Sequence, residues 1–190
     1  MLKHFSKAFC LVGFLSIAAL VANGQEVVHA LAGVVSSIHP SQKTIDVKTD
    51  DGSDGLFKDN TGSNVSLDFD KEIRSAATPA GDFQRTGANV IVYYFSHGDD
   101  RTAVALEDLG QKPIQKFTGT VVKFNRHERL LSIKDASGTI KEFQIGPQTV
   151  AEGPMGAVEA QRFDPEKGDP VRVTATPANG NEEALFIRAD

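Results

Sequence analysis

A short acidic segment has the spacing of oxygen ligands that could bind calcium. It reads Asp50-x-Gly52-x-Asp54-Gly55, with carboxylates at alternating positions and a glycine for the turn. A complete loop of this kind closes with a bidentate acid at its twelfth position, which here is Thr61, so Asp59 or Asn60 would have to replace it. A metal site made of Asp50, Asp54 and Asp59 is therefore one hypothesis, and a solvated acidic turn is the other.

Nucleophilic and histidine chemistry have less support. Ser96-His97-Gly98-Asp99 contains the residue types of a catalytic triad, but neighbours in sequence cannot converge as triad members do, and the segment predicts a polar hairpin turn. Beyond the first 24 residues the histidines are His29, His39, His97 and His127, and no pair has the close spacing of a zinc site. We therefore expect no enzyme activity and no cofactor, and keep a histidine metal site and a hydrolase as alternatives.

One segment predicts a strand that is apolar on both faces. Val90, Val92 and Tyr94 alternate with Ile91, Tyr93 and Phe95. A strand of this kind must be covered on both sides. The Ile91, Tyr93 and Phe95 face is therefore predicted either to pack against the other half of the chain or to bind a ligand, and the sequence does not decide between them.

The chain contains an internal sequence repeat. Residues 33–38 and 44–48 match 119–124 and 130–134 at an offset of 86. Residues 87–92 and 103–106 match 168–173 and 184–187 at an offset of 81. Because the order of the blocks is kept, the sequence predicts two homologous domains, at 27–111 and 114–190.

In each copy, short segments in which apolar and polar residues alternate are separated by turn residues, and this pattern predicts short strands. Five strands with a short helix or loop between the third and fourth are typical of an OB-like barrel, and Gly33 and Gly119 suit the bend of its first strand. No segment has convincing helical periodicity, and the nearest candidates for a short helix are 70–77 and 157–163. The fold class is therefore all-β, with two tandem five-stranded OB-like barrels, and a β-sandwich is the competing architecture.

The first 24 residues are predicted to be a secretory signal peptide. Lys3, His4 and Lys7 precede an apolar run over 9–22, and residues 22–24 form a small-x-small cleavage pattern. A retained anchor is the alternative, and no later segment is apolar enough to span a membrane. The chain has 20 basic and 25 acidic residues, a net charge of -5, and removal of the two lysines makes it -7. Cys10 is lost as well, which leaves a chain without thiol chemistry outside the cytoplasm, in the periplasm or secreted.

The repeat resembles the bacterial secreted domains of unknown function grouped as DUF5666, which are OB-like modules often found in tandem. The residues that carry the resemblance are the following in the second copy: Gly119, Val121, Leu131, Ile133, Gly138, Phe143, Gly168, Val171, Val173, Ala184 and Ile187. The first copy matches through Gly33, Val35, Ile45, Val47, Gly52, Gly87, Val90, Val92 and Ala103, with a longer segment after Gly52. The resemblance implies a fold and a compartment but no activity.

The layout is also similar to periplasmic copper carriers of the CusF type, which bind metal through a histidine, two methionines and a tryptophan. This chain has no tryptophan, and Met155 is its only methionine after the predicted signal peptide, so copper carriage by that route is not expected. We conclude that the sequence favours an exported, noncatalytic binding or interaction module of the bacterial envelope. Its partner is an unidentified envelope protein, peptide or glycan, and the acidic charge argues against nucleic acid.

Overall fold

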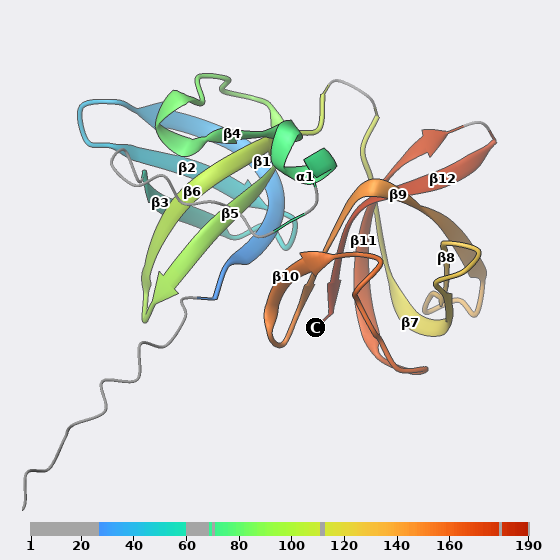
Figure 1. Ribbon diagram of the computed structural model, residues 1–190. Helices are drawn as coiled ribbons and strands as arrows, with labels where there is room; N and C mark the ends of the chain where they lie inside the picture. The colour runs from blue at the N-terminus through green and yellow to red at the C-terminus, as the bar shows by residue number, and fades with distance from the viewer. Residues whose placement is uncertain (1–26, 60–68, 70, 111–112, 179, 190) are drawn as a thin grey trace, which may run out of the picture.

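The structure is a computed structural model that describes residues 27–59, 69, 71–110, 113–178 and 180–189. The predicted signal peptide at 1–24 lies outside these residues. Two β-barrels stand side by side, the first coloured blue to green and the second yellow to red (Figure 1). Within the described residues, no helix has the length and apolar character needed to cross a membrane.

The first barrel is a closed five-stranded sheet. Its strands run in the order β3-β2-β1-β5-β6, and pairing of β3 with β6 closes it, while β4 is added at the outer edge of β6. The elements are β1 (His29–His39), β2 (Thr44–Thr49), β3 (Asp54–Asp59), α1 (Lys71–Ala76), β4 (Ala77–Pro79), the 3₁₀ helix η1 (Ala80–Asp82), β5 (Asn89–His97) and β6 (Asp100–Asp108). The predicted helix at 70–77 is present as α1.

The second barrel closes in the same way. Its strands run in the order β9-β12-β11-β7-β8, and β8 pairs with β9 to complete the ring. The elements are β7 (Gln115–Asn125), β8 (Leu130–Lys134), β9 (Ile140–Gly153), β10 (Gly156–Glu159), β11 (Pro170–Ala178) and β12 (Asn181–Ala189). The candidate helix at 157–163 is not formed. The first part of this segment belongs to β10, which pairs with β9 in a hairpin, and the rest is a turn.

The internal repeat is visible strand by strand. β1 begins at residue 29 and β7 at residue 115, an offset of 86, and both have 11 residues. β5 begins at residue 89 and β11 at residue 170, an offset of 81, and both have nine residues. The pairing of β1 with β2 has a bulge between Val35 and Ser37, and β7 repeats it between Val121 and Lys123. The tandem OB-like fold predicted from the sequence is confirmed.

Each barrel encloses its own apolar core. The first core contains Val35, Ile45 and Phe57, and the second contains the equivalent Val121, Leu131 and Phe143, all of which are buried. Gly33 and Gly119 allow the first strand of each barrel to bend closely over the second. A Cβ atom on Gly33 would lie 2.6 Å from the backbone oxygen of Lys48, and one on Gly119 would lie 2.6 Å from that of Lys134.

A third apolar cluster joins the two barrels. The first barrel contributes the outer faces of β1, β5 and β6 together with Ile73 of α1, and the second contributes Val150 of β9 and Phe186 of β12. In Figure 1, α1 lies on the side of the first barrel that faces β9, and these two elements are in contact. The barrels are therefore packed against each other rather than only joined by the chain.

Polar contacts surround this shared cluster. Asp50 of the first barrel accepts a 2.6 Å hydrogen bond from the Thr174 hydroxyl, and lies 2.9 Å from the Lys116 ammonium. Glu152 of the second barrel binds the first strand twice: Oε1 lies 2.7 Å from Nδ1 of His29, and Oε2 accepts a 2.8 Å hydrogen bond from the amide of Ala30. These contacts fix the orientation of one barrel relative to the other.

Candidate functional site: a basic pocket on the second barrel

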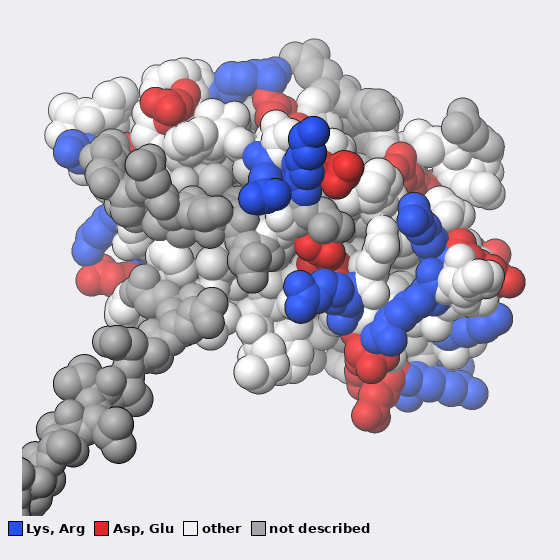
Figure 2. All heavy atoms as spheres, viewed as in Figure 1, with Lys and Arg blue, Asp and Glu red and all other residues white. Residues whose placement is uncertain are grey.

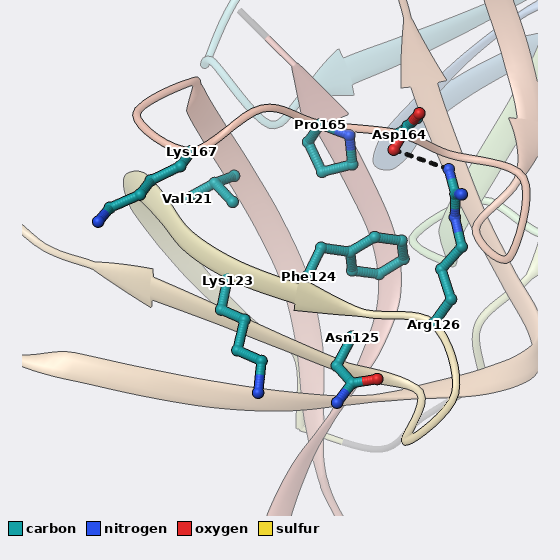
Figure 3. Close-up of a pocket in the computed structure, with 8 residues that line it drawn as sticks. All are labelled: Val121, Lys123, Phe124, Asn125, Arg126, Asp164, Pro165 and Lys167. Atoms are coloured by element: carbon teal, nitrogen blue, oxygen red, sulfur yellow. Dashed lines mark ion pairs between the residues drawn. The ribbon is translucent and has the colours of Figure 1, made fainter.

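A pocket opens on the second barrel where β7 ends beside the segment between β10 and β11. Its volume is about 500 Å³, and eight residues line it: Val121, Lys123, Phe124, Asn125, Arg126, Asp164, Pro165 and Lys167. Figure 3 shows Phe124 and Pro165 facing each other in the middle, with Arg126 and Asp164 at one side and Lys167 toward the other. The pocket therefore combines an apolar base with a basic rim.

Arg126 is held in place by two neighbours from the opposite wall. Its Nη2 atom lies 2.8 Å from Oδ1 of Asp164 and donates a 3.2 Å hydrogen bond to the carbonyl oxygen of Phe163. The Phe163 ring in turn packs edge-on against Phe124, with 6.3 Å between the ring centroids. Both contacts use Nη2, so they orient the guanidinium while its other N–H groups can donate to a second carboxylate or a similar anion.

The two lysines supply the rest of the positive charge. Neither Lys123 nor Lys167 has an ion-pair partner among the residues that the structure describes. Lys123 directly follows the bulge in β7, and its side chain extends away from the Phe124 base (Figure 3). With Arg126, three cations and one acidic side chain line the pocket, so it favours anions although the whole chain is acidic.

The same place on the first barrel lacks this charge. At the observed offsets, Ser37, Pro40 and Thr86 occupy the positions of Lys123, Arg126 and Lys167. The shared backbone therefore does not require these cations. On the face drawn in Figure 2, acidic and basic side chains are intermixed. The positive charge of the pocket is thus a local property of the second barrel.

The first barrel instead carries a serine, histidine and aspartate cluster at its bulge. Ser37 donates a 2.5 Å hydrogen bond to Oδ2 of Asp46, and Nε2 of His39 lies 3.0 Å from the same oxygen and 3.1 Å from the Ser37 hydroxyl. A nucleophilic triad uses one ring nitrogen for the serine and the other for the acid. Here the same nitrogen meets both, so the cluster is not arranged as a proton relay and is better explained as a polar link between β1 and β2.

The predicted ligand-binding face lies at the contact between the barrels. Ile91 and Tyr93 are fully buried in the shared cluster, and Phe95 is partly buried against it. The equivalent face of the second copy also points into this contact, because Thr174 is buried and binds Asp50. Of the two alternatives that the sequence left open, the structure therefore contains the packing of one copy against the other, and it leaves no accessible surface at Ile91 and Tyr93.

Of the three aspartates predicted to bind metal, Asp50 directly follows β2, and Asp54 and Asp59 lie on β3. Asp50 binds Lys116 and Thr174 of the second barrel. Asp54 and Asp59 occupy opposite ends of β3, about 17 Å apart along an extended strand. The turn is held instead by Asp51, which accepts hydrogen bonds from the amide and the hydroxyl of Ser53 and from the hydroxyl of Thr49. These bonds hold the pKa of Asp51 well below its usual range.

The histidines are equally dispersed. His29 binds Glu152 and His39 binds Asp46, while His97 is exposed at the end of β5 and His127 is exposed in the turn after β7. Among the described residues, no group of three or more histidine, cysteine, aspartate or glutamate side chains is placed to hold a metal ion. Ser96 and His97 end β5, and Gly98 and Asp99 form the turn to β6, so the segment is the polar hairpin tip that the sequence predicts.

Sequence reasoning missed the basic pocket and the polar cluster at Ser37. Lys123 and Arg126 are near each other in sequence, but Lys167 belongs to a segment whose path over the end of β7 leaves no pattern in the chain. One signal was present in the repeat, because the copies differ in charge at equivalent positions. A comparison of the copies for charge as well as for apolar residues would have indicated the pocket.

The fold defines the chain as a tandem of OB-like barrels. No protein-family model and no curated protein sequence matches it. Among solved structures it is similar to one described as the crystal structure of Ag(I)CusF, with 16% sequence identity and a TM-score of 0.32. The similarity covers 41% of this chain and 99% of that one.

Proposed function

We propose that this protein is an exported, noncatalytic binding module of the bacterial envelope, and that its second barrel binds an anionic group of an envelope peptide or glycan. The observation that carries the proposal is the pocket of about 500 Å³ with Lys123, Arg126 and Lys167 around an apolar base. A charged group would bind the cations, and the adjoining part of the ligand would pack on Phe124 and Pro165.

Noncatalytic binding fits the chemistry of this pocket. Its one carboxylate, Asp164, is paired with Arg126, and its lining contains no serine, cysteine or histidine. Nucleophilic or general-base catalysis needs such a group within hydrogen-bond reach of the substrate. The pocket therefore offers charge and surface for binding rather than groups for bond cleavage.

Calorimetric titration of the chain without residues 1–24 tests the proposal. The probes are oligogalacturonate and a hexaglutamate peptide, with maltohexaose and a hexaglutamine peptide as their uncharged counterparts. We expect at least one anionic probe to bind at least tenfold more tightly than its counterpart. The double change Lys123→Gln and Lys167→Gln should weaken that binding about tenfold, because two charge-assisted contacts are lost.

A matched control separates the pocket from the overall charge. Lys48→Gln and Lys134→Gln remove the same charge from exposed, equivalent positions that do not line the pocket. Affinity should be retained in this control. An equal loss of affinity in both double variants would show that binding depends on net charge and not on the pocket, which contradicts the proposal. The proposal would also be contradicted if neither anionic probe binds.

A further inference from the structure

A buried carboxyl group lies where the two barrels meet. Glu107 on β6 is only 5% exposed, and Oε2 accepts a 2.7 Å hydrogen bond from the hydroxyl of Tyr93, which is completely buried. Glu107 is the cross-strand partner of Ile91 on β5, so its side chain belongs to the outer face that packs on the second barrel. An ionised carboxylate in such a place is costly unless it is fully paired.

Among the described residues, no lysine or arginine lines the cavity that Glu107 faces. A cavity of about 180 Å³ between the barrels is lined by Glu107 and Asp108 from the first and by residues that include Thr149, Glu183 and Ala184 from the second. Asp108 is neutralised by Arg85 and also binds the amide of Gly110, and the Thr149 hydroxyl donates to the carbonyl oxygen of Ala184. Glu183 therefore adds a second carboxyl group to the side that Glu107 faces.

The other neighbouring elements do not change this balance. β4, which pairs with β6 at Glu107, contains only Ala77, Thr78 and Pro79. The charged side chains of α1, Lys71, Glu72 and Arg74, are exposed. Burial raises the pKa of Glu107 to about 7, although the hydrogen bond from Tyr93 acts in the opposite direction. The carboxyl group is thus poised to change its charge under ordinary conditions.

We propose that Glu107 is a protonation-controlled lock between the two barrels. With a neutral carboxyl group the barrels stay closely packed, and ionisation of Glu107, buried without a cation in a cavity between the barrels, loosens the contact. The ion pair of Asp50 with Lys116 and the hydrogen bond from Thr174 to Asp50 lie outside the Glu107 cavity and continue to hold the barrels together, so the contact loosens without the barrels separating completely. This inference is independent of the ligand proposed for the basic pocket.

Hydrogen exchange measured by NMR tests the lock at two amides that report directly on the contact. The Ala30 amide binds Glu152, and the Ala157 amide donates a 2.8 Å hydrogen bond to the carbonyl oxygen of Val28 in the other barrel. Opening releases one proton from Glu107 between its exposed and its buried pKa. After correction for intrinsic exchange, protection of both amides should therefore fall about tenfold per pH unit from pH 5 to 7 and level off above pH 7.

Glu107→Gln is the decisive variant, because the amide keeps the acceptor for Tyr93 and cannot ionise. Its protection at Ala30 and Ala157 should stay nearly constant over the same range, whereas Glu142→Gln, at an exposed position on β9, should behave like the unchanged chain. An unchanged slope in Glu107→Gln, or no slope in the natural sequence, would overturn the proposal.

A distance measurement covers the case in which Glu107→Gln folds poorly. Spin labels on Ser41→Cys and His127→Cys would occupy exposed turns at equivalent positions of the two barrels, and Cys10 lies in the predicted signal peptide and is removed. The distribution of distances between the labels should broaden between pH 5 and pH 7.5 in the chain with Glu107. A distribution that stays the same over this range would contradict the lock.

Discussion

Tyr93 donates its phenolic hydrogen to Glu107 at 2.7 Å, and both side chains are buried where the barrels meet. The pair lies in a cluster whose other members are apolar, which includes Val150 and Phe186 of the second barrel. The bond satisfies two polar groups that would otherwise be buried without partners. The apolar contact between the barrels thus encloses one buried polar pair, both of whose members belong to the first barrel.

Tyr93→Phe should destabilise the chain by about 1–3 kcal/mol near neutral pH, because Glu107 loses its only hydrogen-bond donor among the described residues. The pKa of Glu107 should also rise further, since the lost bond lowers it. Urea denaturation at pH 7.5 and at pH 5 measures the effect. The loss should be smaller at pH 5, where the carboxyl is neutral, and an equal loss at both values would contradict this account.

The stability of the chain should decrease as the pH rises from about 4.5 to 7. The folded state holds the Glu107 proton to a pKa of about 7, against 4.5 for the free side chain, so this group stabilises the fold most at low pH. The contribution lost over this interval is at most about 3 kcal/mol. Denaturation midpoints in urea at half-unit pH steps should show the fall, and Glu107→Gln should remove most of it.

Gly33→Ala and Gly119→Ala should each destabilise their barrel by about 2 kcal/mol or more. The added methyl group would lie 2.6 Å from a backbone oxygen of the neighbouring strand, which cannot move aside as a side chain can. Gly153→Ala is the control, because its nearest contact would be the Phe163 ring at 3.7 Å. Thermal unfolding monitored by circular dichroism should separate the control from both other variants.

Phe186→Ala should uncouple the barrels. This side chain is 3% exposed and belongs to the cluster shared by both, so its removal leaves a cavity at the contact and costs about 3 kcal/mol or more. Calorimetry should show one broader or two separate unfolding transitions in place of a single one. Phe163→Ala, within the core of the second barrel, should instead lower the stability of that barrel.

Asp50→Asn should weaken the contact between the barrels and leave any response to calcium unchanged. The carboxylate is engaged by Lys116 and Thr174, and Asp54 and Asp59 lie elsewhere on β3. Thermal melting with and without millimolar calcium measures both effects. A calcium-dependent rise of the melting temperature that disappears in Asp50→Asn would instead support the metal site that the sequence suggests.

The repeat and the barrel could be predicted because they depend on local patterns. Alternating residues such as Ile45 and Val47 indicate a strand that is covered on one face, and Gly33 and Gly119 mark its bend. The apolar outer face at Ile91 and Tyr93 also indicated that something must cover it. Its partners, Val150 and Phe186, could not be named because their pairing depends on how two complete barrels dock.

The candidate site depends on a feature that no local pattern records. The bulge after Val121 places Lys123 and Phe124 beside the segment that carries Asp164 and Lys167, and the same bulge in β1 brings Ser37 opposite Asp46. A bulge adds one residue to one strand and reverses which side the following residues face. Sequence alternation alone therefore assigns these side chains poorly.

The hydrogen bond between Val28 and Ala157 has a consequence for the time course of folding. Val28 directly precedes β1, and Ala157 is the second residue of β10. The bond therefore links the start of the first barrel to a late part of the second. During synthesis the first barrel is complete before β10 has been made. The bond can form only after that, so we expect it to be among the last contacts acquired, and its presence in a nascent chain would report that both barrels have been assembled.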